Sequence, residues 1–460
     1  MSAAVAEPAA IEAVGVHAGP SVARVLPATR AVFWAVCGVV FFAFYNTDHS
    51  FGFSLTEGFI TDTEFMQENA AGGSLSRKLS FLMLAGLGVY GLSAGGRTFR
   101  FAHVGLPLLG LFAAWACVSV LWSVTPAVTV KRLVVWAFFV LGACGVARLC
   151  TPREIVRVAL VVTALVAGVG LFAEFALGTF RPWTALHRFC GTLHPNHQAL
   201  NLATLVLAGT ALLPRTRARA AVIASIAFAC GLLLLTRSRT ALAGVLLSLA
   251  VLSTLSTGWR WKLPAVLFAT TAVAGGFFVL ALGGVDFVEG LGDAATMGRD
   301  DKQVGSLTGR LPIWAAVAPY IAARPLLGWG HDSFWTPYHI EVVSEEVQWG
   351  IRESHSAYID TLLSTGLVGL TLALLAVVAF VLAAAFRYVR EAREIDGFLT
   401  ALFVFAAINA FTESAMSMPG CVPFVTLAAM LSGFFGPAEG PGAAAVVTGR
   451  GGATLPSKAG

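Results

Sequence analysis

Long apolar runs alternate with shorter polar segments along most of the chain. A helix needs roughly 20 predominantly apolar residues to cross a bilayer. Runs of about this length lie at 31–45, 79–96, 103–122, 133–149, 155–177, 198–214, 220–236, 240–257, 263–283, 364–386, 397–413 and 419–436. The first and sixth runs are short. The pattern predicts an all-α polytopic membrane protein with about twelve transmembrane helices.

Segments without such runs set the limits of the membrane domain. Residues 1–30 are rich in Ala and Val, and residues 437–460 are rich in Gly, Ala and Pro. Both are predicted to be disordered tails around a polytopic domain at 31–436. The one long segment between apolar runs covers 284–355, and loops of that length are often functional.

The long loop contains the sequence "LTGRLPIWAAVAPYIAARPLLGWG". A helix is predicted to open near Pro312 and to end before Pro325, with Arg310 just before its first turn. Its apolar face consists of Ile313, Trp314, Val317 and Ile321. We expect short amphipathic helices in this loop to lie on the membrane surface.

Composition narrows the class of protein further. Hydrophobic residues make up 57% of the chain and charged residues 12%, whereas soluble domains average about 25% charged. A chain of soluble domains is therefore excluded. The net charge of +5 is small, and no nucleic-acid partner is expected. The seven cysteines show neither pairing nor metal-ligand spacing.

Basic residues predict the orientation in the membrane. If both termini are cytoplasmic, every inner loop carries Arg or Lys, as the positive-inside rule requires. Thirteen further basic residues then face outward: Arg77, Lys78, Lys131, Arg132, Arg181, Arg188, Arg237, Arg239, Arg299, Lys302, Arg310, Arg324 and Arg352. Topology does not explain them, and a shared anionic ligand at the outer surface is the simplest reason for their presence.

Four segments on the predicted outer face carry the candidate chemistry. They are "HRFCGTLHPNHQAL" at 187–200, "TRSRT" at 236–240, "GRLPIW" at 309–314 and "ESHSAYIDTLLSTGLVGL" at 353–370. Arginine makes bidentate and permanently charged contacts with phosphate oxygens. A histidine at a helix start stays neutral and can act as a general base. The segments therefore suit a ligand that carries a diphosphate.

These segments resemble the superfamily of bacterial O-antigen ligases and O-antigen or exopolysaccharide polymerases. The resemblance rests on "G-T-x-H-P-N" at 191–196, "T-x-S-R" at 236–239 and "G-R-x-x-x-W" at 309–314, followed by "P-L-L-G-W-G-H-D-S-F" at 325–334 and "H-S-A-Y-I-D-x-L-x-x-x-G-L-x-G" at 355–369. It extends from about 130 to 435. The order and spacing of the motifs are more specific than any one of them.

The resemblance implies a metal-independent, inverting glycan transfer without a cofactor, at the outer face of the bacterial inner membrane. Arg239 and Arg310 would bind the donor phosphates, and His355 would activate the acceptor hydroxyl. Lys131 or Arg132 matches a further basic position. Ser356 follows the histidine, where the family usually has Asn.

The same resemblance implies the partners. The donor would be an oligosaccharide on undecaprenyl diphosphate, and the acceptor a second glycan or lipid A core, with the lipid bilayer and polysaccharide assembly proteins as further candidates. Additional substrate-binding candidates are Arg237, Arg188, His194 and Asn196. A turn started by Pro195 explains His194 and Asn196 equally well.

Other functions stay open at this stage. A repeat-unit polymerase is favoured over a ligase that transfers the glycan to lipid A core, because the family contains many polymerases. Asp62 and Glu64 in "FITDTEF" resemble the acidic pair of metal-dependent lipid-phosphosugar glycosyltransferases, although a solvated acidic loop explains them as well. A polysaccharide transporter would need charges in the centres of its helices, and the apolar runs have none unpaired there.

Overall fold

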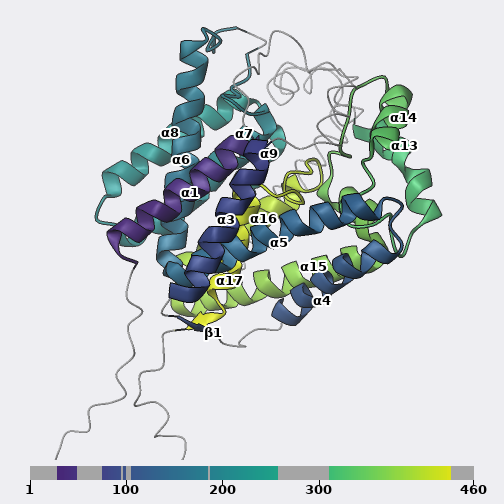
Figure 1. Cartoon of the computed structure of the whole chain (residues 1–460). Helices are drawn as coiled ribbons and strands as arrows, with labels where there is room; N and C mark the ends of the chain where they lie inside the picture. The colour runs from purple at the N-terminus through teal and green to yellow at the C-terminus, as the bar shows by residue number, and fades with distance from the viewer. Residues whose placement is uncertain are drawn as a thin grey trace, which may run out of the picture.

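The computed structural model describes residues 28–48, 75–94, 97–99, 105–184, 187–256 and 310–436. Figure 1 shows these residues as an assembly of helices. The described residues also contain one pair of two-residue strands. The predicted all-α class is therefore confirmed for the described part of the chain. The two predicted tails, apart from 28–30, and the acidic pair Asp62 and Glu64 lie outside the described residues.

Helices occupy the predicted apolar runs. They are α1 (Arg30–Asp48), α3 (Leu75–Ala94), α4 (Gly105–Val118), α5 (Pro126–Leu149), α6 (Pro152–Ala176), α7 (Pro195–Leu212), α8 (Arg219–Thr236), α9 (Arg239–Ser256), α15 (Ala357–Glu391), α16 (Glu394–Asn409) and α17 (Cys421–Ser432). The short 3-10 turns η2 (Ser119–Leu121) and η3 (Leu213–Arg215) extend α4 and α7. The run at 263–283 lies outside the described residues.

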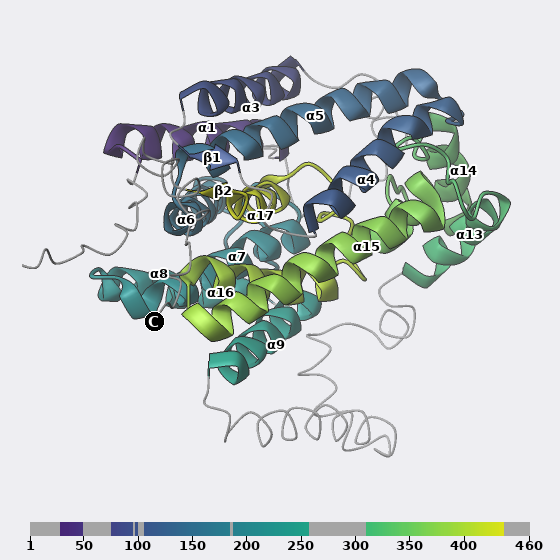
Figure 2. The ribbon, with the colours of Figure 1, turned by 90° about the horizontal axis from the view of Figure 1, so that it is seen from below.

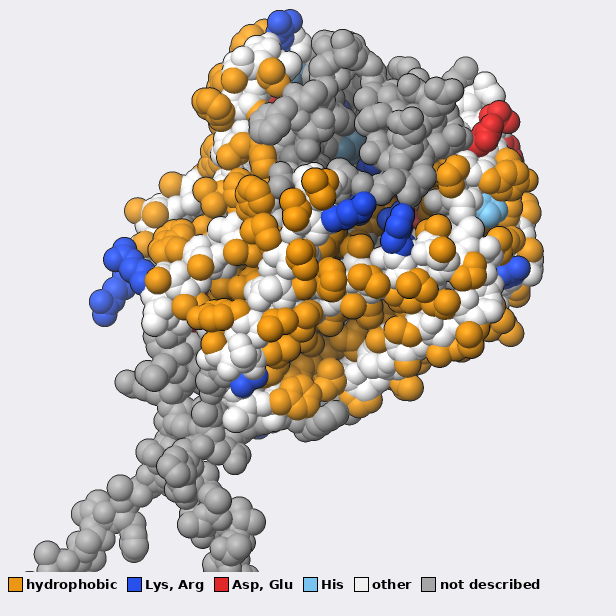
Figure 3. All heavy atoms as spheres, in the orientation of Figure 1, with side chains coloured by type: hydrophobic (Ala, Val, Ile, Leu, Met, Phe, Trp, Pro, Cys, Tyr) orange, Lys and Arg blue, Asp and Glu red, His pale blue; other side chains and the backbone are white. Residues whose placement is uncertain are grey.

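Five of these helices, α5, α6, α8, α9 and α15, are long and apolar enough to cross a membrane. Figure 3 shows hydrophobic side chains over much of one face of the molecule, with few charged side chains among them. Both observations agree with a polytopic membrane protein. The total of about twelve spans stays a prediction.

Helix α7 lies in the interior of the assembly, packed against α6, α8, α9, α16 and α17 (Figure 2). Most of its side chains are buried, including the polar Gln198, Asn201 and Thr204. Because other helices surround α7, it has little surface that must be apolar to face lipid. It can therefore carry polar groups up to its first residue, Pro195, where the candidate segment "HPN" lies.

Two short helices, α13 (Arg310–Ala323) and α14 (Pro337–Val347), lie together at one end of the molecule (Figures 1 and 2). Ile313 and Val317 of α13 pack with Phe334, Val343 and the early α15 residue Leu363 in a separate apolar cluster. The predicted loop helix is therefore present. It begins at Arg310, so this arginine lies in the first turn and not before it.

Helix α15 is broken at Gly366, whose φ of 67° and ψ of −172° no other residue readily adopts. The segment "PLLGWG" at 325–330 fills the break. The amides of Trp329 and Gly330 donate to the carbonyls of Leu363 and Ser364, at 2.8 and 2.9 Å. On the other side of the break, the Leu367 amide donates to the Pro325 carbonyl at 2.8 Å. The first turns of α15 are thus fixed to the loop that carries α13 and α14.

The other end of the molecule is closed by strands β1 (Thr98–Phe99) and β2 (Phe435–Gly436), which pair antiparallel with Phe99 opposite Phe435. The buried guanidinium of Arg97 donates to the carbonyls of Ala147 and Cys150 at the end of α5, at 2.7 and 3.0 Å, and to that of Ser432 at the end of α17, at 3.1 Å. Arg97 therefore satisfies carbonyls that helix ends leave without partners.

Candidate active site

The segment that precedes α7 is fixed by a buried carboxylate. Oε1 of Glu174, near the end of α6, accepts the backbone amides of Cys190 and Gly191, both at 2.8 Å. Gly191 has a φ of 63°, and a Cβ there would come within 2.7 Å of the Gly170 Cα. Only glycine suits this position. The segment therefore leads into α7 with Arg188 and His194 held at its start.

Arg188 connects two of the predicted segments. Its Nε donates to the Thr236 carbonyl at the end of α8, at 3.0 Å, and its terminal nitrogen donates to Oδ1 of Asn196 at 2.9 Å. The amide nitrogen of Asn196 donates in turn to Oε1 of Glu413 at 2.6 Å. A continuous chain of hydrogen bonds therefore runs from the "TRSRT" turn through α7 to the segment after α16.

Arg310 completes this network from the opposite side. Its Nε donates to the Thr412 carbonyl at 2.7 Å, and its terminal nitrogen forms an ion pair with the same Glu413 oxygen that Asn196 contacts. Burial raises the pKa of Glu413 to about 7, against the opposing effect of Arg310. The two arginines, 188 and 310, are thus held around one nearly buried carboxylate.

His355 lies directly before α15 and adopts the left-handed conformation, with a φ of 53°. Its ring stacks on Trp349, with centroids 5.4 Å apart and planes at 8°. Its Nδ1 lies 3.3 Å from a carboxylate oxygen of Glu353, a contact without good hydrogen-bond alignment. A non-glycine residue held in this conformation is strained, and such strain concentrates at functional sites.

Burial lowers the pKa of His355, and Arg310, His197 and Arg352 lower it further, whereas Glu353 opposes them. The imidazole is therefore neutral near pH 7. The amide of Ala357, two residues after His355, donates to the Glu413 carbonyl at 3.2 Å, so the start of α15 lies beside the residue that Arg310 contacts. The roles of Arg310 and His355 stay predictions.

His194 caps the start of α7. Its Nδ1 accepts the backbone amide of Asn196 at 3.3 Å. Burial lowers the pKa of His194 well below its ordinary value, and the charges of His197, Arg188, His355 and Arg310 act in the same direction. The neutral ring therefore keeps its proton on Nε2. Pro195 therefore starts a helix and not a free turn, with His194 as its cap and Asn196 as its second residue. Asn196 accepts from Arg188 and shares the Glu413 carboxylate with Arg310.

The turn between α8 and α9 consists of Arg237 and Ser238. Arg237 has a φ of 53° and ends α8, a position where glycine is usual. Arg239 is the first residue of α9, and Gly244, about one and a half turns further, packs against Asn409 at the end of α16. Arg239 therefore lies at the same end of the bundle as Thr412 and Glu413.

The side chain of Arg239 is half-buried. Within the ranges that the structure describes, its guanidinium forms no hydrogen bond or ion pair. Arg239 is thus the candidate whose charge no neighbouring carboxylate offsets in these ranges.

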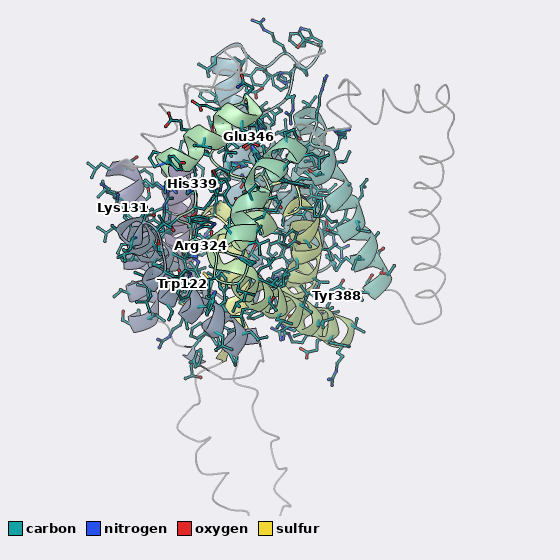
Figure 4. All side chains as sticks on the ribbon, turned by 90° about the vertical axis from the view of Figure 1, so that its right-hand side faces the viewer. Trp122, Lys131, Arg324, His339, Glu346 and Tyr388 are labelled. Atoms are coloured by element: carbon teal, nitrogen blue, oxygen red, sulfur yellow. The ribbon has the colours of Figure 1, made fainter. Side chains whose placement is uncertain are left out.

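Lys131 and Arg132 belong to a different neighbourhood. They lie in the first turns of α5, where Arg132 forms an ion pair with Asp332 at 3.5 Å. Figure 4 labels Lys131 at the left edge of the molecule and Arg324 nearer its centre. The Arg324 guanidinium covers the Trp329 ring at 4.5 Å. The Arg132–Asp332 ion pair is separate from the hydrogen bonds that join Arg188, Asn196, Glu413 and Arg310.

The site also contains carboxylates that the sequence analysis missed: Glu174, Glu353, Asp360 and Glu413. Asp360 accepts Nε1 of Trp335 at 2.9 Å and the Ser354 amide at 3.1 Å, and it also accepts the Ser414 hydroxyl. It therefore ties the residue before His355 to the residue after Glu413. Among the described residues, no group of three His, Cys, Asp or Glu side chains is arranged to hold a metal ion.

Two comparisons with known proteins bear on this site. Residues 223–374 match the family model described as "O-Antigen ligase". The chain is also 25% identical over 289 residues to the exopolysaccharide production protein ExoQ of Rhizobium meliloti (strain 1021). That similarity covers 57% of this chain and 61% of the relative. The family match includes Arg237, Arg239, Arg310 and His355.

Proposed function

From these two matches, which support membership of the superfamily of O-antigen ligases and polymerases, we propose that this chain is an inverting, metal-independent glycosyltransferase. It joins a glycan carried on undecaprenyl diphosphate to a sugar hydroxyl at the outer face of the bacterial inner membrane. We propose that the product is a longer repeat-unit polymer. The relative is named for exopolysaccharide production, which favours a polymerase.

The observation that carries this proposal is the approach of Arg188, Arg310 and His355 from three separate segments at one end of the bundle. Guanidinium groups in a partly buried site stabilise the charge that develops on a departing diphosphate. Arg239 adds a charge that no described carboxylate offsets. The site thus combines an anion-binding side with a neutral imidazole.

The reaction follows from these groups. The acceptor hydroxyl attacks the anomeric carbon from the side opposite the diphosphate, and Nε2 of His355 takes the hydroxyl proton. A new C–O bond forms while the C–O bond to the diphosphate breaks, so the configuration inverts. The diphosphate leaves with the bonding electrons and remains on its lipid, where Arg239 and Arg310 stabilise its charge.

A deletion strain complemented with variants tests this function. We expect His355→Ala to abolish polymer formation while lipid-linked single repeat units accumulate on the outer leaflet. The exposed Arg217 lies between η3 and α8 and has no role in the site, so Arg217→Ala should restore native polymer. The lipid extract is analysed by mass spectrometry and the polymer by gel electrophoresis.

The same strains separate the remaining functions when the lipid-linked units are first probed in intact spheroplasts with a glycan-modifying enzyme that cannot cross the membrane. Long glycans that remain unattached to lipid A core in the deletion strain or in the His355→Ala strain would indicate that the protein is a ligase and not a polymerase. Units retained on the cytoplasmic leaflet would indicate a transporter and contradict the proposal. So would native amounts of polymer in the His355→Ala strain.

A further inference from the structure

Glu353 is a buried carboxylate that the proposed reaction does not yet use. Its side chain is 7% exposed, although it is separated from His355 by a single residue. Only Oε1 lies near the imidazole, and Oε2 has no hydrogen-bond partner among the described residues. A buried carboxylate with so few hydrogen bonds is costly unless nearby positive charge stabilises it. The position of Glu353 therefore requires an explanation.

The surroundings of the imidazole restrict what Glu353 can do. One face of the His355 ring is covered by Trp349. The backbone before the ring is fixed, because the Ser354 amide donates to Asp360 and the Ser354 carbonyl accepts Nε1 of Trp314 at 3.0 Å. Nδ1 lies 3.3 Å from Oε1 of Glu353, within reach of a hydrogen bond after a small rotation of either side chain. Nε2 is the ring nitrogen that remains for a substrate.

We propose that Glu353 is the positioning residue of His355: its carboxylate accepts the Nδ1 proton and leaves Nε2 as the base. This inference rests on the proposed function. When Nε2 takes the proton of the acceptor hydroxyl, the imidazole becomes an imidazolium beside a carboxylate. Glu353 then stabilises the charge that forms, and it is not itself protonated.

The charged groups around His355 explain why such a carboxylate is needed. The titratable and charged side chains that interact with this pair come from five segments: Arg310 of α13, His194 and His197 at the start of α7, Arg352 beside His355, Asp360 of α15, and Glu413 after α16. Arg310 and Arg352 are permanently cationic and oppose an imidazolium. Burial favours a protonated Glu353, but His355, His197, Arg352 and Arg310 outweigh it and lower the pKa of Glu353. The carboxylate therefore stays ionised at neutral pH.

Glu353→Gln separates this role from a structural one. Glutamine keeps an oxygen that accepts the Nδ1 proton but removes the charge, so the loop can retain its shape. Turnover should fall about 10- to 100-fold, with the KM for the lipid-linked donor within about twofold of native. The acid limb of the turnover–pH profile should move down by about one pH unit, because losing a nearby carboxylate lowers the pKa of His355.

Two further variants control this result. Glu353→Asp keeps the charge and should return the acid limb to its native position while turnover recovers only in part. Glu341 on α14 is exposed, and Glu341→Gln should leave both turnover and its pH profile unchanged. All are measured on the purified full chain in nanodiscs with lipid-linked repeat units isolated from the deletion strain.

A second measurement needs no substrate. Diethyl pyrocarbonate modifies neutral imidazole, so the pH dependence of His355 modification, followed by mass spectrometry, reports its pKa. The same downward shift is expected in Glu353→Gln. A native pH dependence and native turnover in this variant, together with loss of turnover in His355→Ala, would overturn the role of Glu353 alone. Full turnover in His355→Ala would instead overturn the proposed function.

Discussion

Arg310 is the residue that connects the two sides of the site. Its Nε donates to the Thr412 carbonyl, and its terminal nitrogen donates to the Glu413 carboxylate. The same carboxylate accepts a hydrogen bond from the Asn196 side-chain amide. This arrangement needs donors that point in different directions within one rigid plane. A guanidinium has such donors and an ammonium does not. A buried charge pair of this kind holds both partners in place but adds little net stability. The contacts of Arg310 thus fix the direction of its guanidinium and add little to the stability of the fold.

Replacement of Arg310 by lysine tests this geometry without removing the charge. We expect kcat/KM for the lipid-linked donor to fall about 100-fold, since the contacts with phosphate lose their fixed direction. Arg217→Lys, at an exposed position of the other end of the molecule, should have no effect. Initial rates of the purified variants provide the measurement. An Arg310→Lys enzyme within about twofold of native would show that charge alone is sufficient.

The basic half of the site could be predicted from the sequence, whereas the acidic half could not. Arginines that topology does not explain point to an anionic ligand, and His355 belongs to a recognisable motif. Glu413 is 103 residues away from the Arg310 that it contacts. A single sequence contains no signal for that pairing, because any outer carboxylate is a chemically acceptable partner. The position of Glu413 at the edge of an apolar run was the available hint.

At the scale of elements, the break in α15 determines where His355 lies. The sequence predicts an apolar run from 364 to 386, but the helix begins at Ala357 and changes direction at Gly366. The "PLLGWG" segment supplies the missing hydrogen bonds. Hydropathy does not reveal such a break, because the bonds come from a segment that is distant in sequence. A broken membrane helix is tolerated where protein covers its backbone.

Gly366→Ala should therefore destabilise the protein. A side chain cannot readily adopt this backbone conformation, and its Cβ would overlap the Leu326 carbonyl. The expected loss is about 1 to 3 kcal/mol of unfolding free energy, seen as a lower thermal midpoint in detergent. Gly231 of α8 has open space around it, so Gly231→Ala should preserve the midpoint. Equal midpoints for both variants would argue against a strained break.

At the scale of the whole molecule, successive helices carry the candidate residues to one end and Arg97 and the two strands to the other. Most of the described helices lie on predicted apolar runs, whereas α13 and α14 lie outside them. Their packing did not, because apolar helices look alike in a single sequence. The interior position of α7 is the clearest case. The polar side chains at the start of α7 made the predicted apolar run at 198–214 short. In the structure they are buried among other helices.

The predicted orientation can be tested with cysteine substitutions. Tyr338 of α14 is 65% exposed at the end that contains the site, and Arg217 is exposed between η3 and α8. A membrane-impermeant maleimide applied to intact spheroplasts should label Tyr338→Cys and leave Arg217→Cys unlabelled until the cells are opened. Labelling of the unmodified protein gives the background from its native cysteines. Labelling in the reverse order would place the site in the cytoplasm, away from the proposed acceptor.

We propose that Arg239, Arg310 and His355 together transfer a glycan from a lipid diphosphate without a metal ion. The most direct measurement is the release of undecaprenyl diphosphate by the purified chain in nanodiscs, with lipid-linked repeat units as donor and acceptor. We predict equal release with and without EDTA, and a decrease of at least about 100-fold when any of the three residues is replaced by alanine. Release that stops in EDTA, or that continues at the native rate in His355→Ala, would contradict the claim.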